Sequence, residues 1–182
     1  MALPRQRQLV VPVADLLRQP GARKEVHVEA EADGLSVIDT RVPDGAPIRM
    51  DLEVEALTDG LMVTGHVSAA WEAACRRCLG PVTGRIEADV QELHKRAAND
   101  DEAFAFEGDL LNLEPMLREV VMLELPLAPL CRPDCAGLCP VCGADRNQGD
   151  CGHHEVPLDP RWSALAELVV VDDDERMDPG PA

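Results

Sequence analysis

The sequence predicts an α+β domain: an antiparallel β-sheet or partly closed barrel, a helix packed against it, and a cysteine-rich zinc knuckle. Three observations support this prediction. Apolar and polar residues alternate through several segments before residue 95, as half-buried strands require. An amphipathic stretch follows at residues 113–125, and five of the seven cysteines then lie between residues 131 and 151.

The first expected elements are short. Residues 13–18 predict a short helix, which Pro20 and Gly21 stop. Residues 24–32 alternate between apolar and mostly acidic side chains, so they predict a strand with one buried face. A weak second strand is expected around residues 35–38, before a turn that contains proline and glycine.

A meander of three strands is expected next. Residues 48–57 and 61–71 alternate as two partner strands. Asp59 and Gly60 predict a type I′ turn between them, because both central positions of that turn need positive φ. Residues 82–93 predict the third strand, and the loop before it carries the first cysteine pair.

A loop and the main helix follow the meander. Residues 97–108 are polar and acidic and predict an exposed loop. Asn112 can cap a helix over residues 113–125, whose apolar side chains form a broad stripe. Pro126 and Pro129 then end the helix, because proline cannot continue it.

The chain is expected to form a single domain over residues 1–171. Its zinc-binding part spans residues 131–154, with residues 75–78 contributing. A last short helix is expected over residues 161–169. The acidic tail at residues 172–182 predicts disorder.

Composition narrows the possible partners. The 182 residues include 17 Lys and Arg against 34 Asp and Glu, a formal net charge of −17. This acid excess argues against binding nucleic acid by coating its phosphates and against adhesion to anionic lipid. The hydrophobic share of 46% still permits a packed core. We therefore expect an acidic protein whose partner is basic.

The expected location is the cytoplasm, without membrane contact. The apolar stretch at residues 9–13 is broken by Pro12 and is too short for a signal-peptide core. No run approaches the roughly 20 apolar residues of a membrane helix. In a reducing compartment, clustered cysteines are more often metal ligands than disulfides.

The cysteine spacing is the strongest functional signal. A Cys-x2-Cys turn aims two thiolates at one ion, and a tetrahedral zinc ion takes four such ligands. Seven cysteines and one nearby histidine make eight ligands, enough for two sets of four. The candidate metal ligands are Cys75, Cys78, Cys131, Cys135, Cys139, Cys142, Cys151 and His153.

Two partitions of these ligands are open. In the preferred one, the first four cysteines bind one zinc ion, and the last three bind a second together with His153. In the other, a single ion is held by Cys139, Cys142, Cys151 and either Cys135 or His153, and the first pair stays free. Spacing alone does not decide between one ion and two.

Two kinds of chemistry compete with structural zinc. A redox dithiol of the thioredoxin type has its first cysteine at a helix N-terminus, whereas Cys78 is followed by Pro81 and a strand. A catalytic zinc ion keeps an open position and usually has a general base nearby, for which Glu155 is available. Thiolate-rich sites are normally closed, so we predict structural zinc and no enzyme.

The other polar and aromatic candidates receive structural interpretations. The histidines of the predicted strands are interpreted as surface or satisfied core residues, and the tryptophans as core anchors. The arginines near the first cysteine pair are interpreted as part of a solvated face. The residues concerned are His27, His66, His94, Trp71, Trp162, Arg76, Arg77 and Arg85.

One segment resembles a known family. Residues 126–147 read PLAPLCRPDCAGLCPVCGADRN and, with Cys151 after them, closely resemble the YceD family of large ribosomal RNA subunit accumulation proteins. Residues 75–81 resemble the first cysteine pair of that family, and residues 159–165 resemble its C-terminal helix. The family motif has Cys-x-Cys where this chain places His153 after Cys151.

The resemblance implies a cytoplasmic bacterial factor, also found in plastids, that supports 23S rRNA accumulation and assembly of the large ribosomal subunit. It implies no catalytic activity and no small-molecule substrate. The alternative function is a zinc- or thiol-dependent enzyme, a hydrolase or redox protein, that uses the cysteine cluster.

The expected partner is a basic ribosomal protein or a large-subunit assembly intermediate, bound through acidic strand faces. The alternative is that these carboxylates only keep the protein soluble. A rival mechanism is direct RNA contact through Arg76, Arg77, Arg132 and Arg146. The carboxylates in question are Glu25, Glu29, Glu31, Asp51, Glu53 and Glu55.

Overall fold

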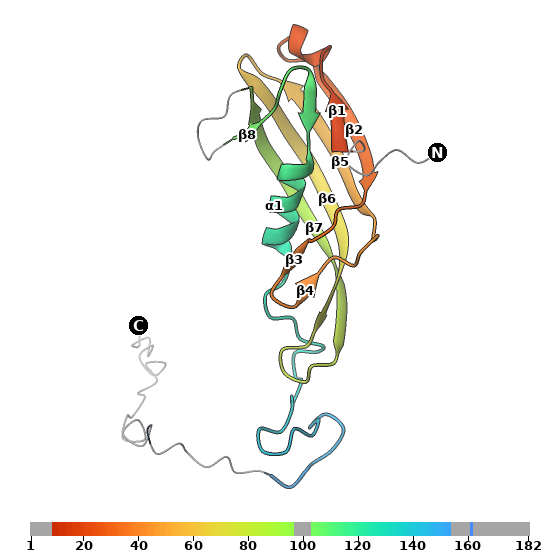
Figure 1. Ribbon diagram of the computed structural model, residues 1–182, viewed down its shortest axis with the longest axis vertical. Helices are drawn as coiled ribbons and strands as arrows, with labels where there is room; N and C mark the ends of the chain where they lie inside the picture. The colour runs from red at the N-terminus through yellow and green to blue at the C-terminus, as the bar shows by residue number, and fades with distance from the viewer. Residues whose placement is uncertain (1–8, 97–102, 154–160, 162–182) are drawn as a thin grey trace, which may run out of the picture. The chain divides into compact units, whose positions relative to one another are not determined.

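The structure is a computed structural model that describes residues 9–96, 103–153 and 161 (Figure 1). The helix expected over residues 161–169 and the tail from residue 172 lie outside the described residues, apart from Arg161. The chain divides into two compact units, residues 1–137 and residues 138–182. We describe each unit by itself.

The first unit is built on a long sheet. Its main strands are β2 (Arg23–Ala30), β5 (Ile48–Ala56), β6 (Gly60–Ala74) and β7 (Pro81–Lys95), and they lie side by side in that order (Figure 1). Each of these pairs is antiparallel, and β6 pairs with β7 along the full 15 residues of both strands. The predicted meander is confirmed, and β6 and β7 are longer than the alternation suggested.

Short strands complete the fold. β3 (Ser36–Val37) and β4 (Thr40–Arg41) form a hairpin beside β6. β1 (Val10–Pro12) and β9 (Leu110–Asn112) form a separate two-stranded sheet. The 3-10 turn η2 (Leu16–Arg18) is all that forms of the helix expected at residues 13–18. The large sheet stays open among the described residues, so the α+β prediction is confirmed without closure into a barrel.

The core lies on one face of the sheet, under the single described helix α1 (Glu114–Glu124). Alternate residues of β5 are buried from Ile48 to Ala56, as the sequence pattern predicted. The helix adds buried Met116, Leu117 and Val121, while the Asn112 side chain accepts a hydrogen bond from the Glu114 N–H (3.0 Å). No described helix is long and apolar enough to cross a membrane.

The turn between β5 and β6 differs from the expectation. The Leu57 N–H donates to the Gly60 carbonyl (2.9 Å), so Thr58 and Asp59 are the central residues. Neither of them has positive φ, so the predicted type I′ turn is wrong. Gly60 is needed for another reason: a Cβ there would lie 2.4 Å from the carbonyl oxygen of His94 on β7.

The loop expected at residues 97–108 is also only partly correct. Residues 97–102 lie outside the described residues. β8 (Phe104–Ala105) pairs with the end of β7 as the one parallel contact of the described sheet. Phe106 is buried in the core, because the alternation of apolar residues at this point outweighs the acidic composition around it.

Candidate metal centres

The first cysteine group lies in the first unit. Its four sulfur atoms, from Cys75, Cys78, Cys131 and Cys135, all lie within 4.8 Å of one another. The Cys75 and Cys135 sulfurs are 3.9 Å apart, and the Cys78 and Cys131 sulfurs are 3.7 Å apart. Four sulfurs at zinc–thiolate distance around a tetrahedral ion would be separated by about 3.8 Å. The spacing therefore fits a zinc ion.

Local backbone geometry presents the first cysteine pair. The Cys75 N–H donates to the Gly80 carbonyl (2.7 Å), and the Leu79 N–H donates to the Cys75 carbonyl (2.9 Å). These bonds close a tight loop between β6 and β7, with Leu79 at a φ of 59°. The loop turns both thiols of the pair to the same side.

The second cysteine pair is brought to this loop by the chain that leaves α1. The Arg76 N–H donates to the Pro129 carbonyl (3.0 Å). The Arg77 guanidinium donates to the Cys135 carbonyl (3.0 Å) and to the Pro133 carbonyl (3.3 Å). Arg77 therefore fixes the segment that carries the last ligand of this group.

The thiols of the first group have unequal proton affinities. Hydrogen bonds from the backbone of Cys78 and of Cys131 lower the pKa of Cys75 to about 6. The hydrogen bond with the Cys135 thiol raises the pKa of Cys131 to about 12. One thiolate is thus stabilised by its neighbours, and a bound cation would stabilise the others as thiolates too.

The second group lies in the second unit. Its ligand atoms come from Cys139, Cys142, Cys151 and His153 and also lie within 4.8 Å of one another. The Cys139 N–H donates to the Ala144 carbonyl (2.8 Å), and the Gly143 N–H donates to the Cys139 carbonyl (2.8 Å). Gly143 has a φ of 74°, so glycine allows this tight turn to close.

Further turns shape the rest of this unit. The Asp145 carboxylate accepts from the Asn147 N–H, and the Asp150 carboxylate accepts from the Gly152 N–H, both at 2.9 Å. Backbone hydrogen bonds from Cys142 and Val141 lower the pKa of Cys139 to about 6. Cys139 is the only buried residue among the described residues 138–153 and 161.

The structure brings together the same two sets of residues that the preferred partition proposed. Both groups could hold metal ions, and their donor chemistry fits zinc better than hard cations, which prefer oxygen ligands. Zinc as the metal, and two ions rather than one, stay predictions.

The strand histidines fall into two classes. His27 and His66 are exposed and pair with Asp51 and Asp89, as a surface interpretation predicts. His94 is fully buried, and neither ring nitrogen makes a well-formed hydrogen bond to another described residue, so its interpretation as a surface or satisfied residue is wrong. Burial lowers the pKa of His94 to about 4, which keeps the ring neutral.

Trp71 packs against the neighbouring strand, whereas Arg76 and Arg85 form ion pairs with nearby carboxylates. Trp71 packs across Gly84, where a Cβ would lie 2.5 Å from the indole ring, and Trp162 lies outside the described residues. Arg76 pairs with Asp39 (3.4 Å), and Arg85 pairs with Glu87 (3.3 Å). The basic spot near the first cysteine group is therefore largely neutralised by its own neighbours.

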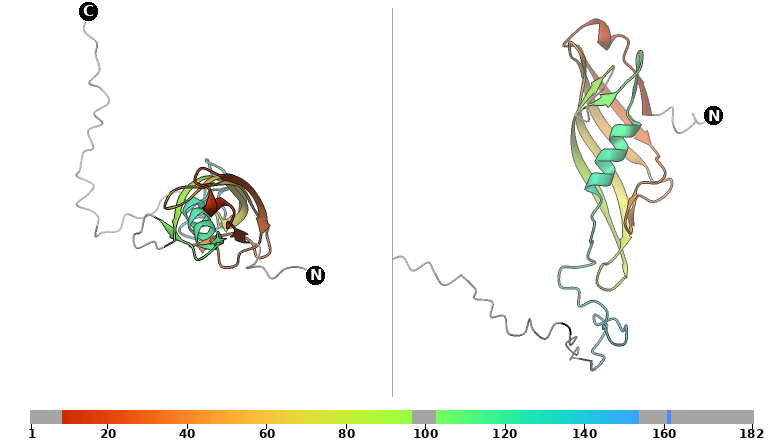
Figure 2. Two further views of the ribbon diagram at one scale, coloured as in Figure 1. Left: turned by 90° about the horizontal axis from the view of Figure 1, so that it is seen from above. Right: turned by 60° about the vertical axis from the view of Figure 1, so that its left-hand side comes forward.

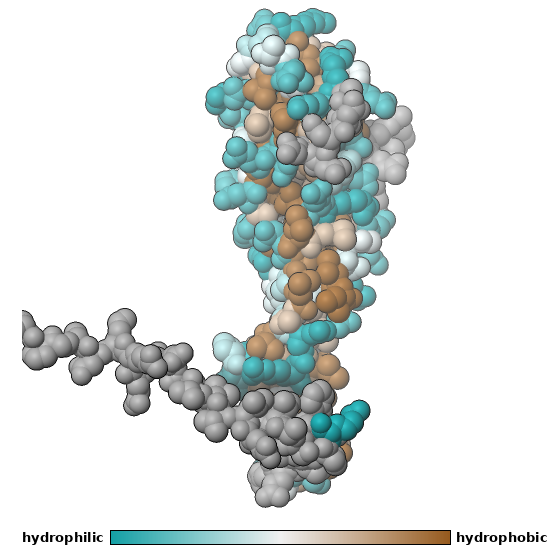
Figure 3. Space-filling view, turned by 90° about the vertical axis from the view of Figure 1, so that its left-hand side faces the viewer, coloured by the Kyte–Doolittle hydropathy of each residue, from teal (hydrophilic) through white to brown (hydrophobic). Residues whose placement is uncertain are grey.

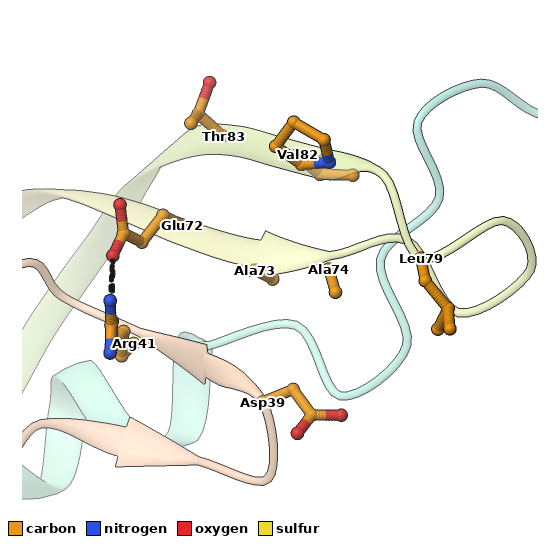
Figure 4. A pocket seen from close by; sticks show the side chains of 9 residues that line it. Asp39, Arg41, Glu72, Ala73, Ala74, Leu79, Val82 and Thr83 are labelled. Carbon is orange, nitrogen blue, oxygen red and sulfur yellow. Dashed lines mark hydrogen bonds and ion pairs between the residues drawn. The ribbon is translucent and has the colours of Figure 1, made fainter.

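A groove of about 410 Å³ lies beside the loop of Cys75 (Figure 4). Its walls are mostly apolar and include the exposed Leu79. The two carboxylates that line it both have arginine partners: Glu72 pairs with Arg41 (2.7 Å) and Asp39 with Arg76. Carboxylates held in ion pairs are poor general acids, so this groove does not resemble an acid–base active site.

Comparison with known proteins identifies the family. The family described as "Large ribosomal RNA subunit accumulation protein YceD" matches residues 63–169, a span that contains all eight candidate ligands. The chain belongs to the YceD family. The resemblance recognised in the cysteine-rich segment is thereby confirmed.

Similar proteins occur in bacteria and in a plant. The chain is 37% identical to an uncharacterized protein of Mycobacterium tuberculosis over 171 residues, which cover 88% of this chain and 81% of that protein. It is 23% identical to YlbN of Bacillus subtilis over 167 residues, or 89% and 97% of the two chains.

The plant relative has a functional name. It is the "Large ribosomal RNA subunit accumulation protein YCED homolog 1, chloroplastic" of Arabidopsis thaliana, 27% identical over 149 residues, or 62% of this chain and 46% of the relative. No solved structure gives a significant match.

Proposed function

We propose that this protein is a non-enzymatic factor that supports the accumulation of 23S rRNA and so the biogenesis of the large ribosomal subunit. The observation that supports the proposal is membership of the YceD family, whose description names accumulation of the large ribosomal RNA subunit. The chloroplast relative carries the same name, which extends the role beyond one lineage.

A structural role for the cysteines supports the non-enzymatic part of the proposal. The two thiols with a lowered pKa, Cys75 and Cys139, are buried, so a substrate would not reach them. Each group also offers four ligands for one tetrahedral ion, which leaves no position for a reacting water. Zinc would therefore hold two folded segments in place.

The partner that we propose is a basic ribosomal protein or an assembly intermediate that contains one. The net charge of −17 favours encounter with a cationic protein and disfavours encounter with RNA at long range. The acidic face of β2 and β5 is less negative than the sequence suggests. Arg23 pairs with Glu53 and Glu55, and Arg49 pairs with Glu29.

A deletion strain tests the proposed function. Cells without the gene should accumulate less 23S relative to 16S rRNA, and the full chain should restore the ratio. A control variant is Asp59→Asn, which removes one exposed carboxylate from a turn and should restore the ratio as the parent does. An unchanged ratio in the deletion strain would refute the proposed function.

Crosslinking in growing cells tests the nature of the partner. We expect the principal adducts of the full chain to be basic ribosomal proteins of the large subunit. If ribosomal RNA dominates the adducts and no ribosomal protein is recovered, direct RNA contact is the correct mechanism.

A further inference from the structure

Among the described residues, the outer edge of β7 has no strand partner over most of its length. One side of β7 pairs with β6 throughout. On the other side, the described residues provide only β8, which contacts His94 and Lys95 (Figure 2). The backbone of residues 82–93 therefore presents a long row of edge groups. Such an edge is a template for another strand, and proteins usually shield it.

The opposite edge of the sheet is protected. The Lys24 side chain on β2 donates to the Pro12 carbonyl (2.9 Å), which ties the segment of β1 against this edge. Cross-strand ion pairs from Arg23 and Arg49 also occupy the outer face there. The two edges of one sheet thus differ in how they are shielded.

Exposed apolar side chains lie on the helix next to the open edge. α1 packs mainly against β7, yet Met122 and Leu123 point away from the core and are 40% and 77% exposed. Leu127, just after the helix, is exposed as well. Figure 3 faces this side of the unit and shows apolar surface running along it, flanked by hydrophilic residues.

A pair of carboxylates in the same place lacks a cation. Glu92 of β7 points to the helix side of the sheet and is half-buried, and Glu119 lies one helical turn before Leu123. Burial, and then the charge of Glu119, raise the pKa of Glu92. Neither carboxylate has a cationic partner among the described residues, in contrast to Glu53 and Glu29.

We propose that an extended, basic segment of a partner protein adds as a strand to the outer edge of β7, beside α1. Its backbone would pair with residues 82–93. Its cationic side chains would meet Glu92 and Glu119, and an apolar side chain would cover Leu123. This proposal rests on the proposed function, because it names the surface on which a basic ribosomal partner would dock.

The charge of the surface argues against a second copy of this chain as the occupant. Antiparallel pairing of two β7 strands centred on Ala88 would place Glu87 of one copy opposite Asp89 of the other, on the exposed face of both strands. Like charges on paired strands repel, whereas lysine and arginine in an added strand would be attracted.

Fluorescence anisotropy with a labelled peptide tests the proposal on the full chain. The probe is the synthetic peptide KVRVKVR, which alternates basic and apolar residues. We expect the double variant Glu92→Gln, Glu119→Gln to weaken binding by about tenfold. The matched control Asp44→Asn, Asp59→Asn removes the same charge from two exposed positions elsewhere and should weaken it less than about twofold. Equal losses in the two double variants would overturn the proposal.

A backbone-modified probe separates strand addition from simple charge attraction. The same peptide with alternate amide nitrogens methylated keeps its side chains but loses edge hydrogen bonds. We expect it to bind at least about tenfold more weakly, and the parent peptide to slow amide exchange in β7. Equal affinity of the two peptides would refute strand addition.

Two further measurements give decisive outcomes. Sedimentation that shows a dimer, strengthened by the Glu92 and Glu119 variants, would assign the edge to a second copy and refute the proposal.

In the deletion strain, the Glu92→Gln, Glu119→Gln double variant should restore less 23S rRNA than the control. Full restoration by the double variant would refute the docking surface. It would leave the proposed function intact, because that function is tested by the deletion itself and by rescue with the parent chain.

Discussion

The two cysteine groups have similar donor chemistry but lie in different structural surroundings. The first joins chain segments 53 and 60 residues apart, at the end of a sheet with an extensive apolar core. The second lies within residues 139–153, in a unit whose only buried described residue is Cys139 itself. A metal ion in the first group would fasten a fold that packing already forms. In the second, it would replace the missing core.

Two sets of similar ligands can therefore contribute unequally to the stability of the units that contain them. Small folded segments without an apolar core depend on metal or disulfide for their structure. The first unit buries its aliphatic side chains between sheet and helix, so removal of its metal leaves most of its stability in place. Three changes would break or sharpen this contrast.

The largest expected effect follows from Cys139→Ser. We expect amide protection across residues 138–153 to fall by roughly 100-fold or more, because metal binding and folding are coupled in this unit. Protection in β5, β6 and β7 should be unchanged. Hydrogen exchange by mass spectrometry measures both regions in one experiment. A variant that keeps its protection in the second unit would show that the metal is dispensable there.

A core substitution should have the reverse pattern. Leu117 is fully buried between α1 and the sheet, and Leu117→Ala should lower the free energy of unfolding of the first unit by about 2–5 kcal/mol. The second group should keep its zinc. Met122→Ala on the exposed side of the same helix is the control, with an expected change within about 0.5 kcal/mol. Denaturant unfolding, together with zinc content, checks both outcomes.

The smallest of the three effects concerns pH. The folded pKa of His94, about 4, lies below the ordinary histidine value of 6.5, so the fold favours the neutral ring. Its contribution to stability is complete above pH 6.5 and is lost as the pH falls toward 4. His94→Phe should flatten this decline in melting temperature, because phenylalanine cannot be protonated and can still stack on Phe104.

His66→Gln is the matched control for this experiment. His66 is exposed and pairs with Asp89, so its loss should leave most of the acid sensitivity of the parent. If melting temperatures of the parent and of the His94 variant fall in parallel between pH 7 and pH 5, the buried ring is not the acid-sensitive group of the first unit.

Much of the fold was predictable, because strand alternation reports directly on which side chains are buried. The alternation through residues 48–57 matches the burial pattern of β5, and Asn112 and the apolar stripe predict α1. Short spacings predicted the cysteine pairs, because each spacing confines two thiols to one turn, but they left the partition into two groups of four open. A local sequence pattern therefore suffices to predict a strand, a helix start or a turn that neighbouring residues form by themselves.

The wrong predictions have different causes. The inward register of β7 runs through Ile86, Ala88 and Val90 to His94, so continued alternation was the signal that this histidine is buried. The apolar alternation around Phe106 was masked by its acidic neighbours. Glycine is required at position 60 because a Cβ there would clash with the His94 carbonyl on β7. Sequence spacing alone does not reveal this contact.

Native mass spectrometry of the full chain, purified under reducing and zinc-replete conditions, tests the central claim most directly. We expect two zinc ions per chain in the parent protein, and one in each of the variants Cys78→Ser and Cys139→Ser. That pattern assigns one ion to each group of four ligands. A single ion in the parent would contradict the two-site account, and no ion with all thiols free would contradict the metal centres altogether.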